Sequence, residues 1–165
     1  MTPTDFLLRP GRPDELDAIN AVVERAVMTW RVPERVKRLA LPGYRYSAHD
    51  FEVFTFVVAE APAHGVAGVA AVEPGERRDL PEGATGVYLH GLYVDPAFHR
   101  RGVGARLFAA ALDHARRRGV DGVLVKAQRD AERFFRAQGM RPLEPDAAAD
   151  YPRRYWMALA PPSAA

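Results

Sequence analysis

A short run of basic residues and glycines, His99-Arg-Arg-Gly-Val-Gly104, is the part of the sequence best suited to binding chemistry. It follows Val87–Val94, whose β-branched and aromatic residues are typical of a strand, and Asp95-Pro96, which ends that strand. It precedes apolar residues at helical spacing from 103 to 115. A strand, a glycine-containing turn and a helix N-terminus direct several backbone N–H groups at one point. The sequence therefore predicts a phosphate-binding turn, with an ordinary tight turn as the alternative.

Two common nucleotide loops do not fit this turn. A dinucleotide-binding loop has Gly or Ala where this chain has Leu107. A nucleoside-triphosphate loop continues with Gly-Lys-Ser/Thr, and no such triplet follows here. Instead, Leu92-Tyr-Val-Asp-Pro96 and Arg101-Gly-Val-Gly104 resemble the coenzyme A loop of the GNAT superfamily of N-acetyltransferases. The family pattern is Gln/Arg-x-x-Gly-x-Gly/Ala after a strand that ends in Val-Asp-Pro. His99 stands here in place of the first Gln or Arg.

Composition and charge narrow the function classes. The chain has 165 residues, 48% of them hydrophobic and 27% charged, with a net charge of +2. This balance suits one small polyanionic ligand better than a nucleic-acid groove. The lack of cysteine excludes disulfides and a cysteine nucleophile, and the scattered His49, His64 and His114 predict no metal site. Without a leader or an apolar run of about 18 residues, we expect a cytoplasmic protein with no membrane segment.

The remaining periodicities predict an α/β (α+β) fold in a single domain over residues 1–160, with a disordered tail over 161–165. Helices are expected at 14–28, capped by Asp14, at 33–39, after Gly104 and at 130–138. Strands are expected at 6–9, 53–59, 66–72, 87–94, 121–126, 140–143 and 155–159. Short links make the three middle strands an antiparallel meander, and the helix after Gly104 makes 121–126 parallel to 87–94. The result is a mixed, mostly antiparallel central sheet of six to seven strands flanked by helices.

This element order is similar to that of the GNAT-like acyl-CoA N-acyltransferase fold. The segment Gln128-Arg-Asp-Ala-Glu-Arg-Phe-Phe-Arg-Ala-Gln-Gly-Met140 also resembles the family's Asn-x-x-Ala-x-x-Phe-Tyr-x-x-x-Gly-Phe. The resemblance implies that acetyl-CoA is the cosubstrate, with pantetheine along the central strand and the pyrophosphate at residues 101–106. The residues implied to contact coenzyme A are Leu92, Tyr93, Val94, His99, Arg100, Arg101, Gly102, Val103, Gly104, Ala105, Arg106, Gln128, Phe134 and Phe135.

Acetyl transfer to an amine requires that the amine lose a proton before it attacks the thioester. His90 is our first candidate for the base because imidazole titrates near neutral pH, and Tyr88 lies on the same strand face. Glu60 and Glu73 are weaker candidates, and a water relay is a further alternative. Gly91 is expected either to form a bulge that opens the strand to pantetheine or merely to make room for a neighbour.

Phe135 stands where the family has the tyrosine credited with protonating the leaving thiolate, and Tyr151 or Tyr155 are candidate substitutes. We expect an acetyl-CoA-dependent N-acetyltransferase in which a primary amine of a small molecule or protein attacks directly in a ternary complex. The alternative is a non-catalytic acyl-CoA sensor or regulatory domain of the same fold. The acceptor is left open, and the strand ends leave room for a homodimer.

Overall fold

The computed structural model describes residues 5–145 and 151–161. The strands are β1 (Leu7–Pro10), β2 (Thr55–Ala61), β3 (Gly65–Pro74), β4 (Gly86–Val94), β5 (Gly122–Ala127), β6 (Arg141–Pro142) and β7 (Arg153–Ala158). The α-helices are α1 (Leu16–Val27), α2 (Glu34–Tyr44), α3 (Asp50–Val53), α4 (Val103–Arg118) and α5 (Glu132–Ala137). The 3-10 helices are η1 (Pro13–Glu15), η2 (Pro96–Phe98) and η3 (Arg129–Ala131). Of the tail expected over 161–165, residues 162–165 lie outside the described residues.

Within the described residues the strands form one seven-stranded sheet in the order β1-β2-β3-β4-β5-β7-β6. β4 and β5 are parallel, whereas β1 with β2, β5 with β7 and β6 with β7 are antiparallel. The short links make β2, β3 and β4 an antiparallel meander. The predicted fold class, the mixed sheet and its parallel crossover are confirmed.

The chain divides into two compact units, Met1–Ala71 with Gly91–Phe108, and Val72–His90 with Ala109–Ala165. β3, β4 and α4 each contribute residues to both units. The single domain expected over residues 1–160 stays a prediction.

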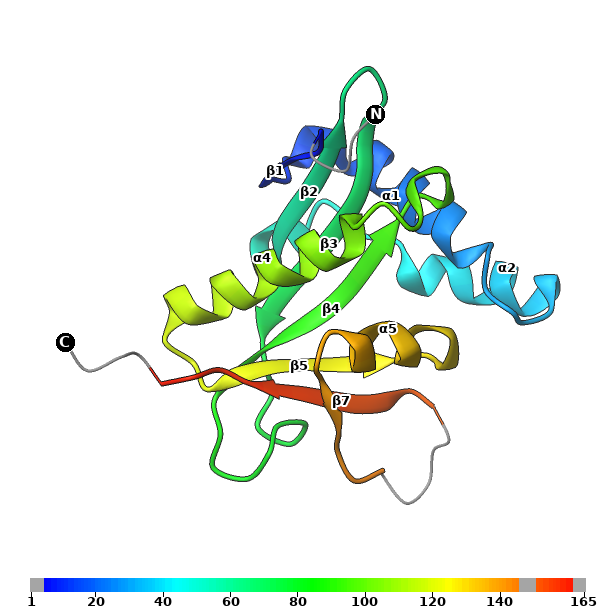
Figure 1. The fold of residues 1–165 in the computed structure, drawn as a ribbon. Helices are drawn as coiled ribbons and strands as arrows, with labels where there is room; N and C mark the ends of the chain where they lie inside the picture. The colour runs from blue at the N-terminus through cyan, green and yellow to red at the C-terminus, as the bar shows by residue number, and fades with distance from the viewer. Residues whose placement is uncertain (1–4, 146–150, 162–165) are drawn as a thin grey trace. The chain divides into compact units, whose positions relative to one another are not determined.

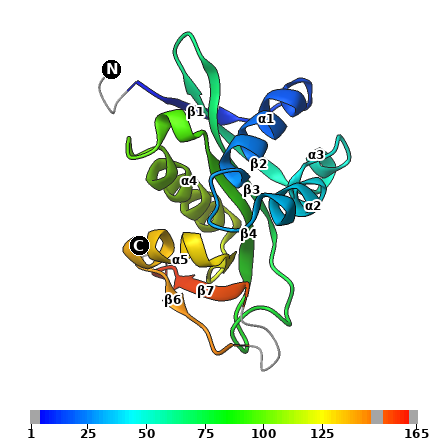
Figure 2. The same ribbon diagram turned by 90° about the vertical axis from the view of Figure 1, so that its right-hand side faces the viewer.

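The core of the first unit is built on α1. Its apolar residues recur at the spacing of one helix face, and they are Ile19, Val22, Val23, Ala26 and Val27. They pack with Phe56 and Val58 of β2 and Val66 and Val69 of β3. Figure 2 shows α1 and α2 on one side of these strands. This packing holds the C-terminal end of α1 rigidly against the sheet.

The second unit is centred on β5, whose residues Val123, Leu124 and Val125 are buried. Leu124 packs with Leu80 and Trp156. α5 lies beside β5 and β7 (Figure 1), and its Phe135 is buried. Such a continuous apolar run is expected for a strand flanked by others and covered by a helix.

The segment before β2 is partly helical, contrary to the expected strand start at Val53. Asp50–Val53 forms the single turn α3, and β2 begins at Thr55. The Asp50 carboxylate accepts the N–H of Ser47 at 2.6 Å, which fixes the chain in a helical turn.

Two helix ends also differ from expectation. Asp14 does not cap the first helix, because Glu15 accepts the N–H of Arg12 at 2.9 Å while Asp14 pairs with the Arg12 side chain. α2 continues through Pro42 to Tyr44 instead of ending at 39. A proline in the last turn keeps a helical φ and gives up only its own N–H, so the helix can extend past it.

Gly91 makes room for a neighbour, which was one of its two expected roles. Burial alternates without a break along Val87–Val94, whereas a bulge inserts an extra residue into this pattern. A Cβ on Gly91 would overlap the hydroxyl of Tyr46 and lie 2.6 Å from the Tyr93 ring. Asn20 of α1 fixes Tyr46 there through two hydrogen bonds of 2.8 Å to its backbone.

Gly91→Ala is expected to lower the free energy of unfolding by about 1–3 kcal/mol, the usual cost of overpacking. Tyr46→Phe removes the atom that Cβ would overlap, so the double variant should be more stable than the sum of the two single effects predicts. Urea unfolding of the four proteins measures this coupling. Gly43→Ala, where a Cβ meets nothing within 4 Å, is the control and should not destabilise. Strict additivity of Gly91→Ala and Tyr46→Phe would contradict the close approach.

Candidate functional site

The turn before α4 has the backbone of an anion cradle. Arg100 and Gly102 have positive φ angles of 62° and 79°, and left-handed residues in a turn curl successive N–H groups toward one side. The first bond into the helix runs from the N–H of Arg106 to the carbonyl of Gly102 at 3.1 Å. The N–H groups of Val103 to Ala105 therefore precede the helical ladder, at the positive end of the helix dipole. This geometry suits a phosphate, and the pyrophosphate contacts of residues 101–106 stay predictions.

Two side chains of this turn, His99 and Arg101, contact the chain that precedes it. His99 places Nε2 3.1 Å from the carbonyl of Val94, so its ring bonds back to the strand end. The exposed guanidinium of Arg101 lies 5.5 Å from the ring centroid of the buried Phe98. This cation–π contact keeps a positive charge beside the turn.

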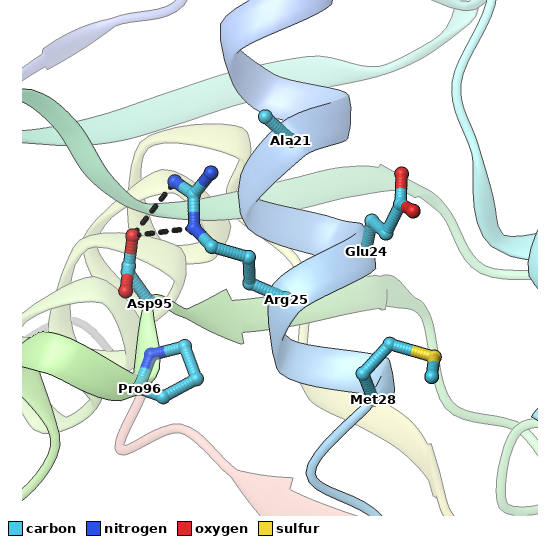
Figure 3. A pocket seen from close by; sticks show the side chains of 6 residues that line it. All are labelled: Ala21, Glu24, Arg25, Met28, Asp95 and Pro96. Carbon is cyan, nitrogen blue, oxygen red and sulfur yellow. Dashed lines mark hydrogen bonds and ion pairs between the residues drawn. The ribbon is translucent and has the colours of Figure 1, made fainter. Parts of the chain in front are cut away.

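Asp95 joins the end of β4 to α1 and is only 3% exposed. One carboxylate oxygen accepts the N–H of Ala97 at 3.0 Å, and the other accepts Nε and Nη2 of Arg25 at 2.8 and 2.7 Å (Figure 3). His64 lies 3.6 Å from the second oxygen. Burial alone would raise the pKa of Asp95, but these donors outweigh burial and leave the pKa below its ordinary value. The ionised carboxylate therefore fixes where β4 ends and the turn begins.

An open depression of about 420 Å³ lies beside this ion pair. Its lining residues come from one face of α1 and from the end of β4 (Figure 3), and they are Ala21, Glu24, Arg25, Met28, Asp95 and Pro96. Glu24 also pairs with Arg45 at 2.6 Å. Sequence reasoning missed this depression, although the i, i+3, i+4, i+7 spacing of its helical residues could have indicated a shared face.

The two residues predicted to be catalytic lie together on one face of β4. The ring centroids of Tyr88 and His90 are 5.6 Å apart. Lys126 of β5 places its ammonium group 5.3 Å from the Tyr88 ring centroid and 2.9 Å from the Asp79 carboxylate. Burial, together with the negative charges of Glu73 and Asp79, raises the pKa of Tyr88 to about 12. Tyr88 is therefore a neutral phenol at pH 7, able to donate a hydrogen bond but not to act as a base.

The candidate substitutes for the missing tyrosine share one partner. Tyr151 and Tyr155 each donate a hydroxyl hydrogen bond of 2.6 Å to the Glu132 carboxylate. Burial and this hydrogen bond raise the pKa of Tyr155. Phe135 is buried, and its ring packs edge-on against Phe134 at 5.1 Å. Both hydroxyls therefore make hydrogen bonds that join α5 to β7 and to the residues just before it.

Other predicted residues have structural partners. Arg106 donates to the carbonyl of Phe6 at 2.8 Å, so its guanidinium ties α4 to the chain before β1. Tyr93 is buried in the core of the first unit, which leaves its backbone as the part that could face a ligand. Glu60 pairs with Arg9 at 2.5 Å, which weakens it further as a candidate base. Gln128 precedes η3 and is half-buried.

The described residues contain no cluster of three or more His, Cys, Asp or Glu arranged to hold a metal ion. Among the same residues, every helix is too short or too polar to span a membrane.

Comparison with known proteins identifies related folds. Residues 20–140 match the acetyltransferase (GNAT) family. The PaiA N-acetyltransferase of Thermoplasma acidophilum, solved in complex with coenzyme A, has 13% identity and a TM-score of 0.76, over 93% of this chain and 99% of its own. A GNAT family acetyltransferase of Brucella melitensis in complex with acetyl-CoA has 21% identity and a TM-score of 0.64, over 94% of this chain and 89% of its own. A comparison with curated proteins gives no match.

Asp95→Asn is expected to lower the free energy of unfolding at pH 7 by about 1.5–3 kcal/mol, the range for hydrogen bonds to charged groups. Because the folded-state pKa lies below the unfolded one, the carboxylate stabilises the protein above the unfolded pKa, and this contribution is lost as pH falls through the folded pKa. Urea unfolding across pH should show the stability of the two proteins converging as pH falls through the lowered folded-state pKa of Asp95.

Asp113→Asn is the control for this substitution. Asp113 is exposed on α4 and pairs with Arg116 at 2.8 Å, so its replacement should cost less than about 0.5 kcal/mol. A stability difference between the wild type and Asp95→Asn that does not change with pH would contradict the role given to the Asp95 charge.

Proposed function

Since most of its length matches the acetyltransferase (GNAT) family, the chain belongs to that family of acyltransferases, and we propose that it transfers an acetyl group from acetyl-CoA to a primary amine. The amine belongs to a small molecule or a protein and attacks directly in a ternary complex. A cytoplasmic location and a homodimer are part of the same proposal.

The turn before α4 carries this proposal. Its left-handed residues Arg100 and Gly102 and the N–H groups ahead of the helical ladder are what a pyrophosphate requires. The solved N-acetyltransferase from Thermoplasma acidophilum is in complex with coenzyme A, and the GNAT family acetyltransferase from Brucella melitensis is in complex with acetyl-CoA. We assign the pyrophosphate to this turn and the pantetheine arm to the backbone of Leu92, Tyr93 and Val94.

The sheet pairing supports this placement of pantetheine. Parallel pairing of β4 with β5 ends at Leu89 and Val125, although β5 continues to Ala127 and pairs with β7 along its other edge. The later part of β4 is therefore the part assigned to hydrogen bonding with the cosubstrate, and its N–H groups to polarising the thioester carbonyl.

His90 is the proposed base, and Tyr88 the residue that orients the amine or a water molecule. The rings lie 5.6 Å apart on one face, so both can reach one bound amine. The leaving group needs less help: a thiol has a pKa of about 8.5, so its anion departs tolerably without an acid. Acetyl transfer with Phe135 in place of tyrosine is consistent with this chemistry.

The alternative is an acyl-CoA sensor. It is favoured by the buried Phe135 and by the hydrogen bonds that tie the hydroxyls of Tyr151 and Tyr155 to Glu132. In such a protein the turn would bind acyl-CoA, and no thiol would be released.

Gly102→Ala is expected to weaken coenzyme A binding about tenfold, because a left-handed alanine costs about 1–2 kcal/mol and the turn relaxes away from that conformation. Isothermal titration calorimetry with coenzyme A measures the affinity. Gly83→Ala is the matched control: φ is 76° at Gly83 and 79° at Gly102, and at both positions a Cβ meets nothing within 4 Å. Equal affinities of the two variants for coenzyme A would contradict the assignment of the turn.

Release of free thiol from acetyl-CoA in the presence of a panel of primary amines tests the activity. We expect His90→Gln to lower kcat about 100-fold, the lower end for loss of a general base, with coenzyme A affinity unchanged. His114→Gln, half-buried on α4, is the control and should leave kcat unchanged. Thermal stabilisation by acetyl-CoA without thiol release for any amine would assign the protein as a sensor.

A further inference from the structure

Lysine is rare in this chain. Lysine and arginine together number 23, and only Lys37 and Lys126 are lysines. A guanidinium is not a nucleophile at neutral pH because it stays protonated. The chain therefore carries few side-chain amines of its own, and the position of each can be compared with the proposed catalytic residues.

Lys126 lies at the place where β4 and β5 stop pairing. The last paired residues are Leu89 on β4 and Val125 on β5, so His90 and Lys126 are the next residues on adjacent parallel strands. Tyr88 pairs with Leu124, and side chains alternate along a strand, so Tyr88, His90, Leu124 and Lys126 share one face. The lysine is thus presented on the face that carries the proposed base.

Contacts hold the amine near those residues. The ammonium group is 2.9 Å from the Asp79 carboxylate and 5.3 Å from the Tyr88 ring centroid, and the Tyr88 and His90 rings are 5.6 Å apart. The Lys126 side chain is still 30% exposed, so the amine can leave Asp79 by rotation of its own side chain. The Tyr88 ring thus lies near both the amine and the proposed base, and acyl transfer needs such a primary amine close to the reacting groups.

We propose that Lys126 is an acceptor of the enzyme's own acetyl group, and this rests on the proposed function. The lysine ammonium loses one proton to His90, and Nζ attacks the carbonyl carbon of acetyl-CoA. The new C–N bond forms as the C–S bond breaks, and the coenzyme A thiolate leaves and takes up the second proton from the nitrogen. The products are acetyl-lysine, coenzyme A thiol and one released proton.

Lys37 is not on the strand face that carries the proposed base, and it serves as an internal reference for the rate of acetylation. It lies on α2, and its ammonium donates to the carbonyl of Met28 at 2.7 Å. Chemical acetylation by acetyl-CoA in solution acts on both lysines, whereas an enzymatic step acts on Lys126.

The experiment incubates the full-length protein with acetyl-CoA and no added amine, and follows acetylation of each lysine by mass spectrometry of proteolytic peptides. We expect Lys126 to be acetylated about 100-fold faster than Lys37, and His90→Gln to remove most of that difference. In urea-unfolded protein the two lysines should react at similar rates. Lys126→Arg, which keeps a positive charge beside Asp79, should lose the fast modification and keep the slow one at Lys37.

Equal rates at Lys126 and Lys37 in the folded protein, or a fast rate at Lys126 that His90→Gln leaves unchanged, would overturn the inference. The amine panel separates this result from failure of the proposed function. Thiol release with added amines but no modification of Lys126 removes the inference alone. No thiol release under either condition removes both.

Discussion

The ion pair between the buried Asp95 and the partly exposed Arg25 is the interaction on which the proposed binding site depends. It links the rigid end of α1 to the point where β4 stops, and Ala97 and the backbone of Ala67 complete the hydrogen bonds around Asp95. A carboxylate this deeply buried is tolerated only when donors satisfy it. Because the turn follows within a few residues, the ion pair determines where the N–H groups ahead of α4 point.

A second constraint is the limited length over which β4 pairs with β5. Four residues of each strand pair, and the pairing ends at Leu89 and Val125, whereas β7 pairs with all of β5 along its other edge. A strand whose neighbour departs has main-chain groups available for a ligand, which is the usual logic of β-strand addition. His90 and Lys126 are the residues that follow the last pair, and the alternation of side chains puts them on the same face. The proposed cosubstrate binding and the proposed acyl transfer therefore both depend on where this pairing ends.

Much of this arrangement could be predicted from local patterns. The strand at 87–94, the turn at 99–104 and the helix after it have strong signals, namely β-branched residues, Asp-Pro and helical apolar spacing. Helix boundaries that depend on side-chain hydrogen bonds were harder to predict: the Asp50 carboxylate accepts the N–H of Ser47 before α3, and Glu15, not Asp14, accepts the N–H of Arg12. Such caps depend on which of several similar carboxylates reaches an N–H group, and residue type does not decide that.

The sequence by itself determined the order of elements, the glycine-containing turn before the long helix and the placement of Tyr88 and His90 on one strand, because these depend on residues close together in the chain. Only the tertiary structure decided which side chains from distant parts of the sequence contact these elements. Tyr46 against Gly91, Arg25 against Asp95, and Lys126 with Asp79 beside Tyr88 all join residues far apart in sequence. Periodicity shows which face of an element is buried, whereas sheet register and helix packing select the partner that each side chain meets.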